Sequence, residues 1–397
     1  MNRIALRMLL ADRAKFLGLL FGIAFTSFLV TFAASYFCGF MTRGFALVAE
    51  NPAVDVWVMD PAVEAPEQTV NLPDSALARV RSVDGVAYAA PLVLGSAPAR
   101  FPDGRFQVFE VIGVDDATLQ GVPSWPGGRR ADLRASDAAV VDAGGTEDKL
   151  QTPALARDRW PRDGAHLEAP TRQLAPGDDL LVNERLVRVL GVSATLPRFP
   201  PRPLLYVTVP NALRILPVEA HSLTFVLVRA RPGVGPGELA RRIAARTGFR
   251  ARAAADFRGD TVRWFLLNSE DVGDIAAMLT LAMTMGFGVT GVMLYMFTLE
   301  HQPQYAVLRA LGAPPRQLVR MVLVQAATCA LVGTGLGLGA CSVAGALVGR
   351  IGYPFRMLWY APFAGALGVL LVCIAAAALS LRPVLKLQPA VVFAGGR

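Results

Sequence analysis

Few side chains in this chain of 397 residues could perform acid–base, nucleophilic or metal chemistry. The candidates are three histidines and four cysteines, namely His166, His221, His301, Cys38, Cys329, Cys341 and Cys373. No histidine stands in an HExxH motif or in a pattern that pairs it with a carboxylate, and no GxSxG motif provides a serine nucleophile. The cysteines lie in apolar segments without a CxxC pair, which indicates neither disulfides nor zinc. We therefore expect no catalytic residue and no metal site.

The sequence also has no convincing motif for binding a nucleotide. The sequence GFGVTG, Gly286 to Gly291, fits the GxGxxG pattern of dinucleotide sites, but it lies inside an apolar run instead of following a strand. We interpret its small residues as helix-packing positions. The lysines Lys15, Lys149 and Lys386 all lie outside a GxxxxGK(S/T) motif, the pattern that binds ATP phosphates. We expect no cofactor on this chain, so ATP and magnesium would have to be bound by a partner.

The composition indicates a membrane protein. Hydrophobic residues make up 53% of the chain, above the roughly 45–50% typical of soluble globular proteins. Four segments free of charged residues and histidine are long enough to cross an apolar bilayer core of about 30 Å as helices. They are residues 16–40, 275–299, 321–348 and 361–381. Because ion-driven transporters bury ionisable groups near the middle of the bilayer, their absence here argues against a secondary transporter.

The positive charge is concentrated around these segments. Residues 41–271 contain 27 basic and 28 acidic residues, whereas the rest of the chain contains 12 basic and 3 acidic ones. This distribution follows the positive-inside rule and excludes a basic nucleic-acid patch on a folded domain. The basic flanks are Arg3, Arg7, Arg13 and Lys15, then Arg309, Arg316 and Arg320, then Arg382, Lys386 and Arg397. We predict that these flanks and both termini lie in the cytoplasm.

Residues 41–271 have the texture of a mixed α+β domain. Turn residues separate strand-like runs, and a helix is predicted over residues 236–247 between two of them. The resulting layout is one span, a large extracytoplasmic α+β domain and three further spans. Residues 1–15 are predicted to form an amphipathic cytoplasmic helix, or simply a charged helix end. Residues 300–320 are the cytoplasmic loop between the second and third spans, and residues 382–397 are a cytoplasmic tail.

Small and weakly polar residues follow regular spacings inside the spans. Ser27, Thr31 and Ser35 recur at four-residue steps, and the glycine pairs Gly335/Gly339 and Gly345/Gly349 have the spacing that lets helix backbones approach. Close packing of helices is the simpler interpretation of both sets. A polar path for a substrate is the alternative.

The loop YAVLRALGAPPRQLVR, Tyr305 to Arg320, is a polar segment between two apolar ones. Its apolar residues have helical spacing, Gly312 can end the helix, and Pro314 and Pro315 stop it from continuing. A short amphipathic helix of this kind can dock in a groove on a soluble partner. The alternative is an ordinary cytoplasmic loop.

At this loop the chain resembles the FtsX-like permease family of ABC transporters. The family pattern between the second and third spans is approximately E-R-x-R-E-I-G-x-L-R-A-L-G-A, and here it is EHQPQYAVLRALGA, Glu300 to Ala313. The residues VLRALGA match closely, whereas Gln304, Tyr305 and Ala306 replace the usual E-I-G, which favours the DevC-like branch over the MacB-like one. Two further segments, Ala5 to Phe25 and Leu381 to Phe393, resemble the ends of the family's chains.

The resemblance implies a homodimer in which each copy holds a separate ABC ATPase at a coupling helix. The coupling residues would be Glu300, Tyr305, Leu308, Arg309, Leu311 and Gly312. ATP binding would move the outer domains by mechanotransmission, with a periplasmic adaptor and membrane lipid as further partners and a lipid or hydrophobic small molecule as exported cargo. The rival hypothesis is a membrane-anchored sensor or scaffold that regulates a partner without moving cargo.

Overall fold

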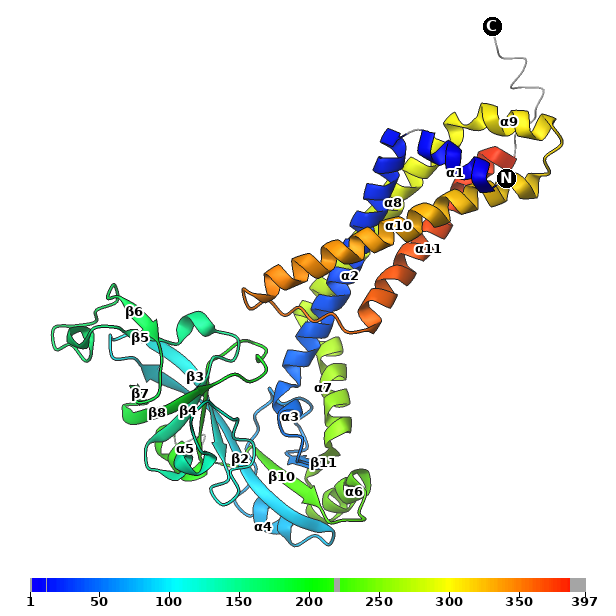
Figure 1. The fold of residues 1–397 in the computed structure, drawn as a ribbon. Coiled ribbons are helices and arrows are strands. Elements are labelled where there is room, and N and C mark those ends of the chain that lie inside the picture. Colours follow the sequence, from blue (N-terminus) through cyan, green and yellow to red (C-terminus); the bar gives the residue numbers. More distant parts are fainter. Residues whose placement is uncertain (1, 12, 218–221, 386–397) are drawn as a thin grey trace. The chain divides into compact units, whose positions relative to one another are not determined.

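The computed structural model describes residues 2–11, 13–217 and 222–385. The chain divides into two compact units (Figure 1). The membrane unit consists of Met1–Phe40 and Ser269–Arg397, and the inserted domain is Met41–Asn268. The predicted domain ended three residues later, at residue 271, inside the first turn of the following helix.

The membrane unit is helical, and four of its helices are long and apolar enough to cross a bilayer. The spanning candidates are α2 (Arg13–Gly44), α8 (Glu270–Glu300), α10 (Pro315–Gly349) and α11 (Tyr360–Leu385). The short helices are α1 (Asn2–Ala11) and α9 (Gln302–Ala310). One span before the inserted domain and three after it confirm the predicted layout. The helices run past the predicted spans because helical structure continues into the polar flanks.

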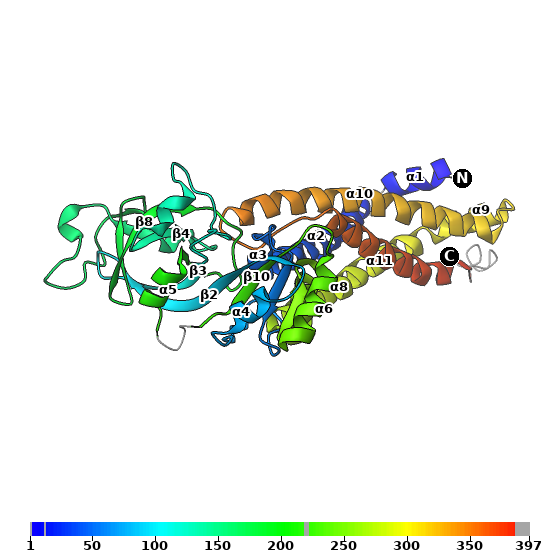
Figure 2. The same cartoon turned by 90° about the horizontal axis from the view of Figure 1, so that it is seen from below.

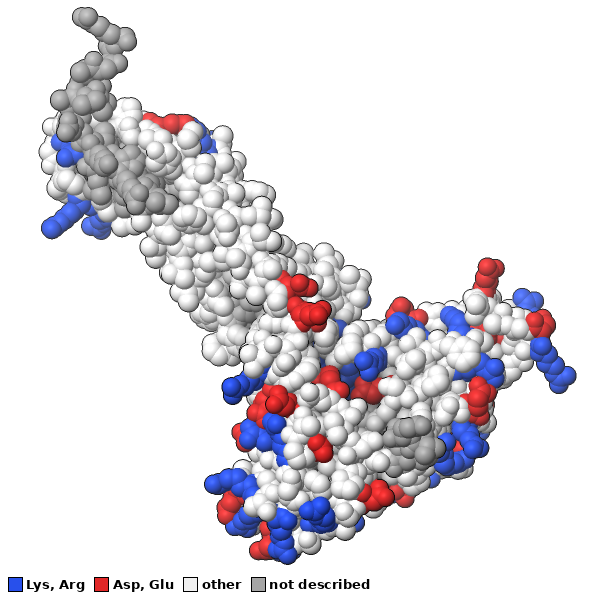
Figure 3. Space-filling view, turned by 180° about the vertical axis from the view of Figure 1, so that it is seen from behind, with Lys and Arg blue, Asp and Glu red and all other residues white. Residues whose placement is uncertain are grey.

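The four spans pack around a shared apolar core. Residues from all four meet there, including Ile23, Leu294, Cys329 and Cys373, and each is nearly or fully buried. Figure 3 shows an uncharged surface along most of this unit, with Lys and Arg gathered at one end. An apolar surface of this extent suits contact with lipid. The predicted tail begins inside α11, which runs to Leu385, and residues 386–397 lie outside the described part of the chain.

The first lobe of the inserted domain is a four-stranded antiparallel sheet in the order β11-β1-β10-β2. Its strands are β1 (Val56–Met59), β2 (Val86–Arg100), β10 (Phe225–Ala230) and β11 (Arg250–Ala253). The helix α4 (Ala76–Arg81) connects β1 to β2, and α6 (Pro236–Thr247) connects β10 to β11. Each helix crosses over one intervening strand, which is the ferredoxin-like arrangement.

The side chains of β1 show how this sheet is buried on both faces. Val56 and Val58 pack into the apolar cluster that α4 and α6 cover. Trp57 and Met59 point to the other face and join a cluster with residues of α3 (Ala46–Ala49) and α7 (Ala254–Asn268). Alternating side chains therefore fill two cores, as the period of a strand requires.

The second lobe is inserted between β2 and β10 and forms a closed ring of strands. Its order is β2-β3-β9-β4-β8-β7, and β7 pairs back to the end of β2 through Ala99 and Val182. Figures 1 and 2 show β2 as a long curved strand that both lobes share. The other strands are β3 (Phe106–Val114), β4 (Ala138–Asp142), β7 (Asp179–Val182), β8 (Arg185–Ser193) and β9 (Leu204–Thr208). Apolar residues such as Phe109, Val141 and Val189 fill its core.

Smaller elements complete this lobe. They are the helix α5 (Val209–Ile215), the paired strands β5 (Gln151–Pro153) and β6 (Thr171–Gln173), and three short 3₁₀ turns at Arg130–Arg134, Glu147–Lys149 and Ala156–Asp158. The fold confirms the predicted α+β class. The strand-like run that follows residues 236–247, FRARAAADF, is a strand only over Arg250–Ala253 and then becomes α7.

Candidate functional site

The predicted coupling loop contains a well-formed short helix. Pro303 lies in the first turn of α9, where its missing N–H costs no hydrogen bond. At the other end, Gly312 has a left-handed φ of 92°, and its N–H donates to the Arg309 carbonyl at 3.1 Å. The N–H of Ala313 donates to the Leu308 carbonyl at 3.0 Å. These two bonds form a Schellman motif, which glycine favours because it has no Cβ to oppose a positive φ.

One face of α9 is fixed to the rest of the membrane unit. Tyr305 is fully buried, and its hydroxyl donates to Oε1 of Gln325 in α10 at 3.2 Å. Nε2 of Gln325 in turn donates to the backbone carbonyl of Ala5 in α1 at 3.0 Å. Burial raises the pKa of Tyr305 to about 12, so the hydroxyl keeps its proton and stays a donor at neutral pH. The helices α1, α9 and α10 are therefore joined by one buried chain of hydrogen bonds.

The opposite face of α9 is open and partly apolar. Val307 is 46% exposed and Leu311 is 79% exposed. Arg309 is half-buried, and Glu300, at the end of α8, forms an ion pair with Lys15. The six predicted coupling residues therefore do not share one surface. Tyr305 and Leu308 face inward, whereas Leu311 and Gly312 are exposed.

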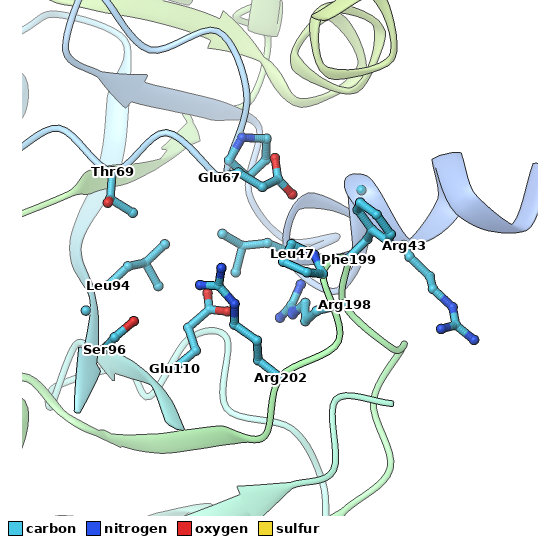
Figure 4. A pocket seen from close by; sticks show the side chains of 14 residues that line it. Arg43, Leu47, Glu67, Thr69, Leu94, Ser96, Glu110, Arg198, Phe199 and Arg202 are labelled. Carbon is cyan, nitrogen blue, oxygen red and sulfur yellow. The ribbon is translucent and has the colours of Figure 1, made fainter. Parts of the chain in front are cut away.

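The inserted domain contains a polar pocket with a volume of about 170 Å³. Figure 4 shows Glu67 on one side of it and Arg202 and Glu110 on the other. Arg198 is only 6% exposed and forms a salt bridge of 2.8 Å with Glu50. No sequence pattern indicated this pocket. Its lining residues come from five separate stretches between Arg43 and Arg202, so no local motif marks them.

Comparison with protein families decides the class of the membrane unit. Residues 276–389 match the family model described as FtsX-like permease C-terminal. These residues form an FtsX-like permease domain. The match begins in α8 and covers α9, α10 and α11, which include the predicted coupling loop. The protein is accordingly a membrane permease subunit of the ABC-transporter type, and the expected resemblance is confirmed.

The solved structures similar to the permease match its inserted domain. The extracellular domain of the noncanonic ABC-type transporter YknZ from Gram-positive bacteria is 14% identical, with 50% of this chain and 98% of that chain covered and a TM-score of 0.31. The periplasmic region of MacB from Actinobacillus actinomycetemcomitans is 11% identical, with 55% and 94% covered and a TM-score of 0.34. A domain of a putative permease from Porphyromonas gingivalis is 17% identical, with 51% and 90% covered and a TM-score of 0.31. No curated protein matches the sequence of the permease.

The predicted packing residues of α2 lie inside the membrane unit. Ser27, Thr31 and Ser35 are all fully buried. The Ser27 hydroxyl donates to the Thr334 carbonyl of α10 at 3.3 Å, and Thr31 lies against Gly365 of α11. The four-residue spacing therefore marks the stripe of α2 that faces two other spans.

The glycines of α10 divide into two faces. A Cβ on Gly337 would lie 2.5 Å from the Ala24 carbonyl oxygen and from Cβ of Ser27. Gly333 is in similar contact with Ile23, and Gly345 with Phe355. A Cβ on Gly335, Gly339 or Gly349 would meet no described atom within 4 Å. Within the described chain, the contact with α2 is made by Gly333 and Gly337, and a packing role for the other face stays a prediction.

His166 has carboxylate partners that the sequence did not predict, whereas Gly286 lies at a helix–helix contact. His166, for which no carboxylate partner was predicted, lies 3.0 Å from Asp158 and 3.2 Å from Asp163, and hydrogen bonds to these two carboxylates raise its pKa. Folding of an irregular loop brings the three together, which local sequence did not indicate. Gly286 of the GFGVTG motif packs in the middle of α8 against Thr26. His221 and Lys386 lie outside the described residues.

Proposed function

We propose that this permease transmits ATP hydrolysis by a separate ABC ATPase to its inserted domain, and so drives export of a lipid, hydrophobic small molecule or similar cargo. The observation that supports the proposal best is the asymmetry of α9. Its inner face is joined to α1 and α10 through Tyr305 and Gln325, and its outer face exposes Val307 and Leu311. A force applied to the outer face would therefore pass into the spans.

The outer face of α9 suits a soluble protein partner. Leu311 and Val307 are exposed apolar side chains at i and i+4, the spacing with which an amphipathic helix enters a groove. Arg309 in α9 and Arg316 and Arg320 at the start of α10 lie on the side that the positive-inside rule assigns to the cytoplasm. Since the sequence has no motif for ATP phosphates, ATP and magnesium are assigned to the partner.

The same charge rule places the inserted domain on the outer side of a bacterial inner membrane, with both chain termini in the cytoplasm. There the domain would act on a periplasmic adaptor or on the cargo itself. We further propose that two copies pair in the membrane, with surrounding lipid. The exposed glycines Gly335 and Gly339 of α10 support a close approach of a second copy, because they meet no described atom of their own chain.

The test is crosslinked affinity purification from native membranes, followed by mass spectrometry. We expect an ATPase with a GxxxxGK(S/T) motif to copurify with the wild type. Leu311→Glu should abolish this copurification, because it places a charge on the exposed apolar face of α9 without removing any buried contact. Arg309→Glu, which reverses the charge of the loop, should weaken it.

The matched control is Leu186→Glu, the same substitution at a leucine that is 47% exposed in the inserted domain. It should retain the ATPase. The proposal would be wrong if no such ATPase copurified with the wild type, and the contact at α9 would be wrong if Leu311→Glu retained it fully. The first outcome would favour the sensor hypothesis.

A further inference from the structure

The polar pocket of the inserted domain has the features of a binding site. Its volume of about 170 Å³ corresponds to several water molecules, since each occupies about 30 Å³ in the liquid. Leu47, Leu94 and Phe199 form apolar walls, and Arg198, Arg202 and Glu110 provide charged groups. This combination of apolar lining and a few converging polar groups is typical of small-molecule sites.

The proposal depends mainly on Arg198, whose side chain is almost completely buried while only part of its guanidinium group forms hydrogen bonds. Its Nη2 donates to Oε2 of Glu50 at 2.8 Å and to the Tyr206 hydroxyl at 3.3 Å. Its Nε and Nη1 are buried and have no hydrogen-bond partner among the described residues. Buried donors without an acceptor are costly and uncommon in folded proteins. Because Arg198 lines the pocket, its two unused donor nitrogens indicate a place for an acceptor with negative charge.

The remaining charges in the pocket do not supply that acceptor. Arg202 is exposed and makes no hydrogen bond or salt bridge with a described residue. Glu110 is half-buried, and its carboxylate leaves Nε and Nη1 of Arg198 unpaired. Glu67 lies across the pocket (Figure 4), and desolvation by the surrounding protein raises its pKa to about 8. Three arginines and two glutamates line the pocket. The pocket therefore has more positive than negative charge.

The position of the pocket in the chain relates it to the bilayer. Arg43 and Gly44, which line it, are the last two residues of α2. They follow the end of the predicted span at residue 40 by three and four residues, a helical rise of about 5–6 Å. In Figure 4 the guanidinium group of Arg43 points away from the middle of the pocket. By chain connection, the pocket lies at the end of the domain where the first span enters it.

We propose that this pocket binds the anionic group, a phosphate or carboxylate, of an amphiphilic molecule taken from the membrane surface. Nε and Nη1 of Arg198 donate to the anion, Arg202 adds a second cation at the entrance, and Leu47, Leu94 and Phe199 contact the carbon atoms next to it. Guanidinium groups suit both anions because they donate several hydrogen bonds in a fixed plane. The inference goes beyond the proposed function and does not rest on it, because binding needs no ATPase.

The experiment is titration calorimetry of the full-length permease in a neutral detergent. The probes are dihexanoyl phosphatidic acid, dihexanoyl glycerol, glycerol 3-phosphate and inorganic phosphate. We expect phosphatidic acid to bind, dihexanoyl glycerol not to bind, and both soluble phosphates to bind at least about tenfold more weakly, the ratio that about 1.4 kcal/mol produces. Equal affinity for inorganic phosphate would assign the site to free anions and overturn the amphiphile. No binding of any probe would overturn the site.

Variants test the assigned residues. Arg202→Gln should weaken phosphatidic acid binding about tenfold or more, as expected when a charge-assisted hydrogen bond is lost. Arg198→Lys keeps a cation beside Glu50 but removes the planar donors, and it should abolish binding. The control is Arg162→Gln, an exposed arginine that does not line the pocket.

Thermal unfolding of each variant checks its fold. If Arg198→Lys fails to fold, Arg202→Gln still decides, because an exposed side chain can be replaced without disturbing a core. Binding by Arg202→Gln equal to that of Arg162→Gln would overturn the assignment of the site.

Discussion

Glu67 shows how a single side chain in the pocket makes the permease sensitive to pH. Desolvation by the surrounding protein raises its pKa from 4.5 to about 8, and the nearby carboxylate of Glu110 adds to this effect. Arg198 and Arg202 act in the opposite direction. The folded state therefore holds this proton more strongly than the unfolded chain does. Folding stability falls as pH rises from about 4.5 to about 8, and this contribution is constant above that window. The side chain keeps exposed surface, and water that reaches it reduces the effect.

Glu67→Gln should remove this pH dependence. Below about pH 4 the carboxyl is protonated in both states, so the variant and the wild type should unfold at the same temperature. At about pH 8.5 the variant should unfold at a higher temperature, because the glutamine carries no charge to desolvate. The measurement is the apparent midpoint of thermal unfolding of the full chain at both pH values. Glu64→Gln, at an exposed glutamate three positions away, is the control. An equal difference at both pH values would contradict this assignment.

At the scale of residues, the sequence predicted local features and missed distant pairs. Gly312 could be recognised as the end of a helix because glycine is common at helix C-termini and Pro314 and Pro315 prevent the helix from continuing. Tyr305 was predicted as a partner contact, but it is a buried anchor, since its hydroxyl group finds Gln325 on the next helix. Glu50 and Arg198 are separated by 148 positions, and only the closed fold brings them together.

At the scale of elements, α10 shows that the spacing of small residues does not reveal which face of a helix packs inside its own chain. Residues at four-residue steps, including Gln325, Cys329, Gly333, Gly337 and Cys341, are all buried. Gly335 and Gly339 have the same spacing on the opposite face and contact no described atom. Both pairs satisfy the small-xxx-small rule, so the rule alone could not distinguish them. The polar Gln325 and the two cysteines on the buried face could have distinguished it from the other face.

These two faces should respond differently to the same substitution. Gly337→Ala should destabilise the permease by about 1–3 kcal/mol, because a Cβ 2.5 Å from the Ala24 carbonyl oxygen forces α10 away from α2. Gly339→Ala, with open space around it, should leave the stability of the isolated chain unchanged or slightly higher. Denaturant unfolding in detergent measures both. Equal loss of stability in the two variants would show that α10 packs differently from the structure.

The sequence predicted best the elements whose ends are marked by residues such as proline and glycine. α6 begins at Pro236 and ends before Gly248, which has a positive φ, and its predicted bounds agree with the structure. Residues 179–192, which the sequence indicated as one strand-like run, are instead two strands, β7 and β8, joined at Asn183 and Glu184 by a two-residue turn with positive φ at both positions. The sequence did not predict α7, because arginines and aspartates stand between its apolar residues and obscure their helical spacing. The pairing of β2 with β7 depends on residues more than 80 positions apart, so no local pattern revealed it.

At the scale of the whole molecule, the distribution of charge and apolar length predicted the layout of spans and the extent of the inserted domain. It could not predict the two lobes of that domain, because the second lobe interrupts the first between β2 and β10. The family match covers α8 to α11 and identifies the permease class of the membrane unit. The proposed mechanism adds that ATP hydrolysis by a partner bound at α9 moves the inserted domain.

The most direct test of this mechanism is a distance measurement in reconstituted membranes with the ATPase bound. A spin label is attached at Arg162→Cys, an exposed position in the inserted domain, since the four native cysteines are buried. Pulsed electron resonance then gives the distance between the labels of two paired copies. We predict that the distance distribution shifts between the nucleotide-free and ATP-bound states, and that Leu311→Glu abolishes the shift. An unchanged distribution while the bound ATPase hydrolyses ATP would contradict the mechanism.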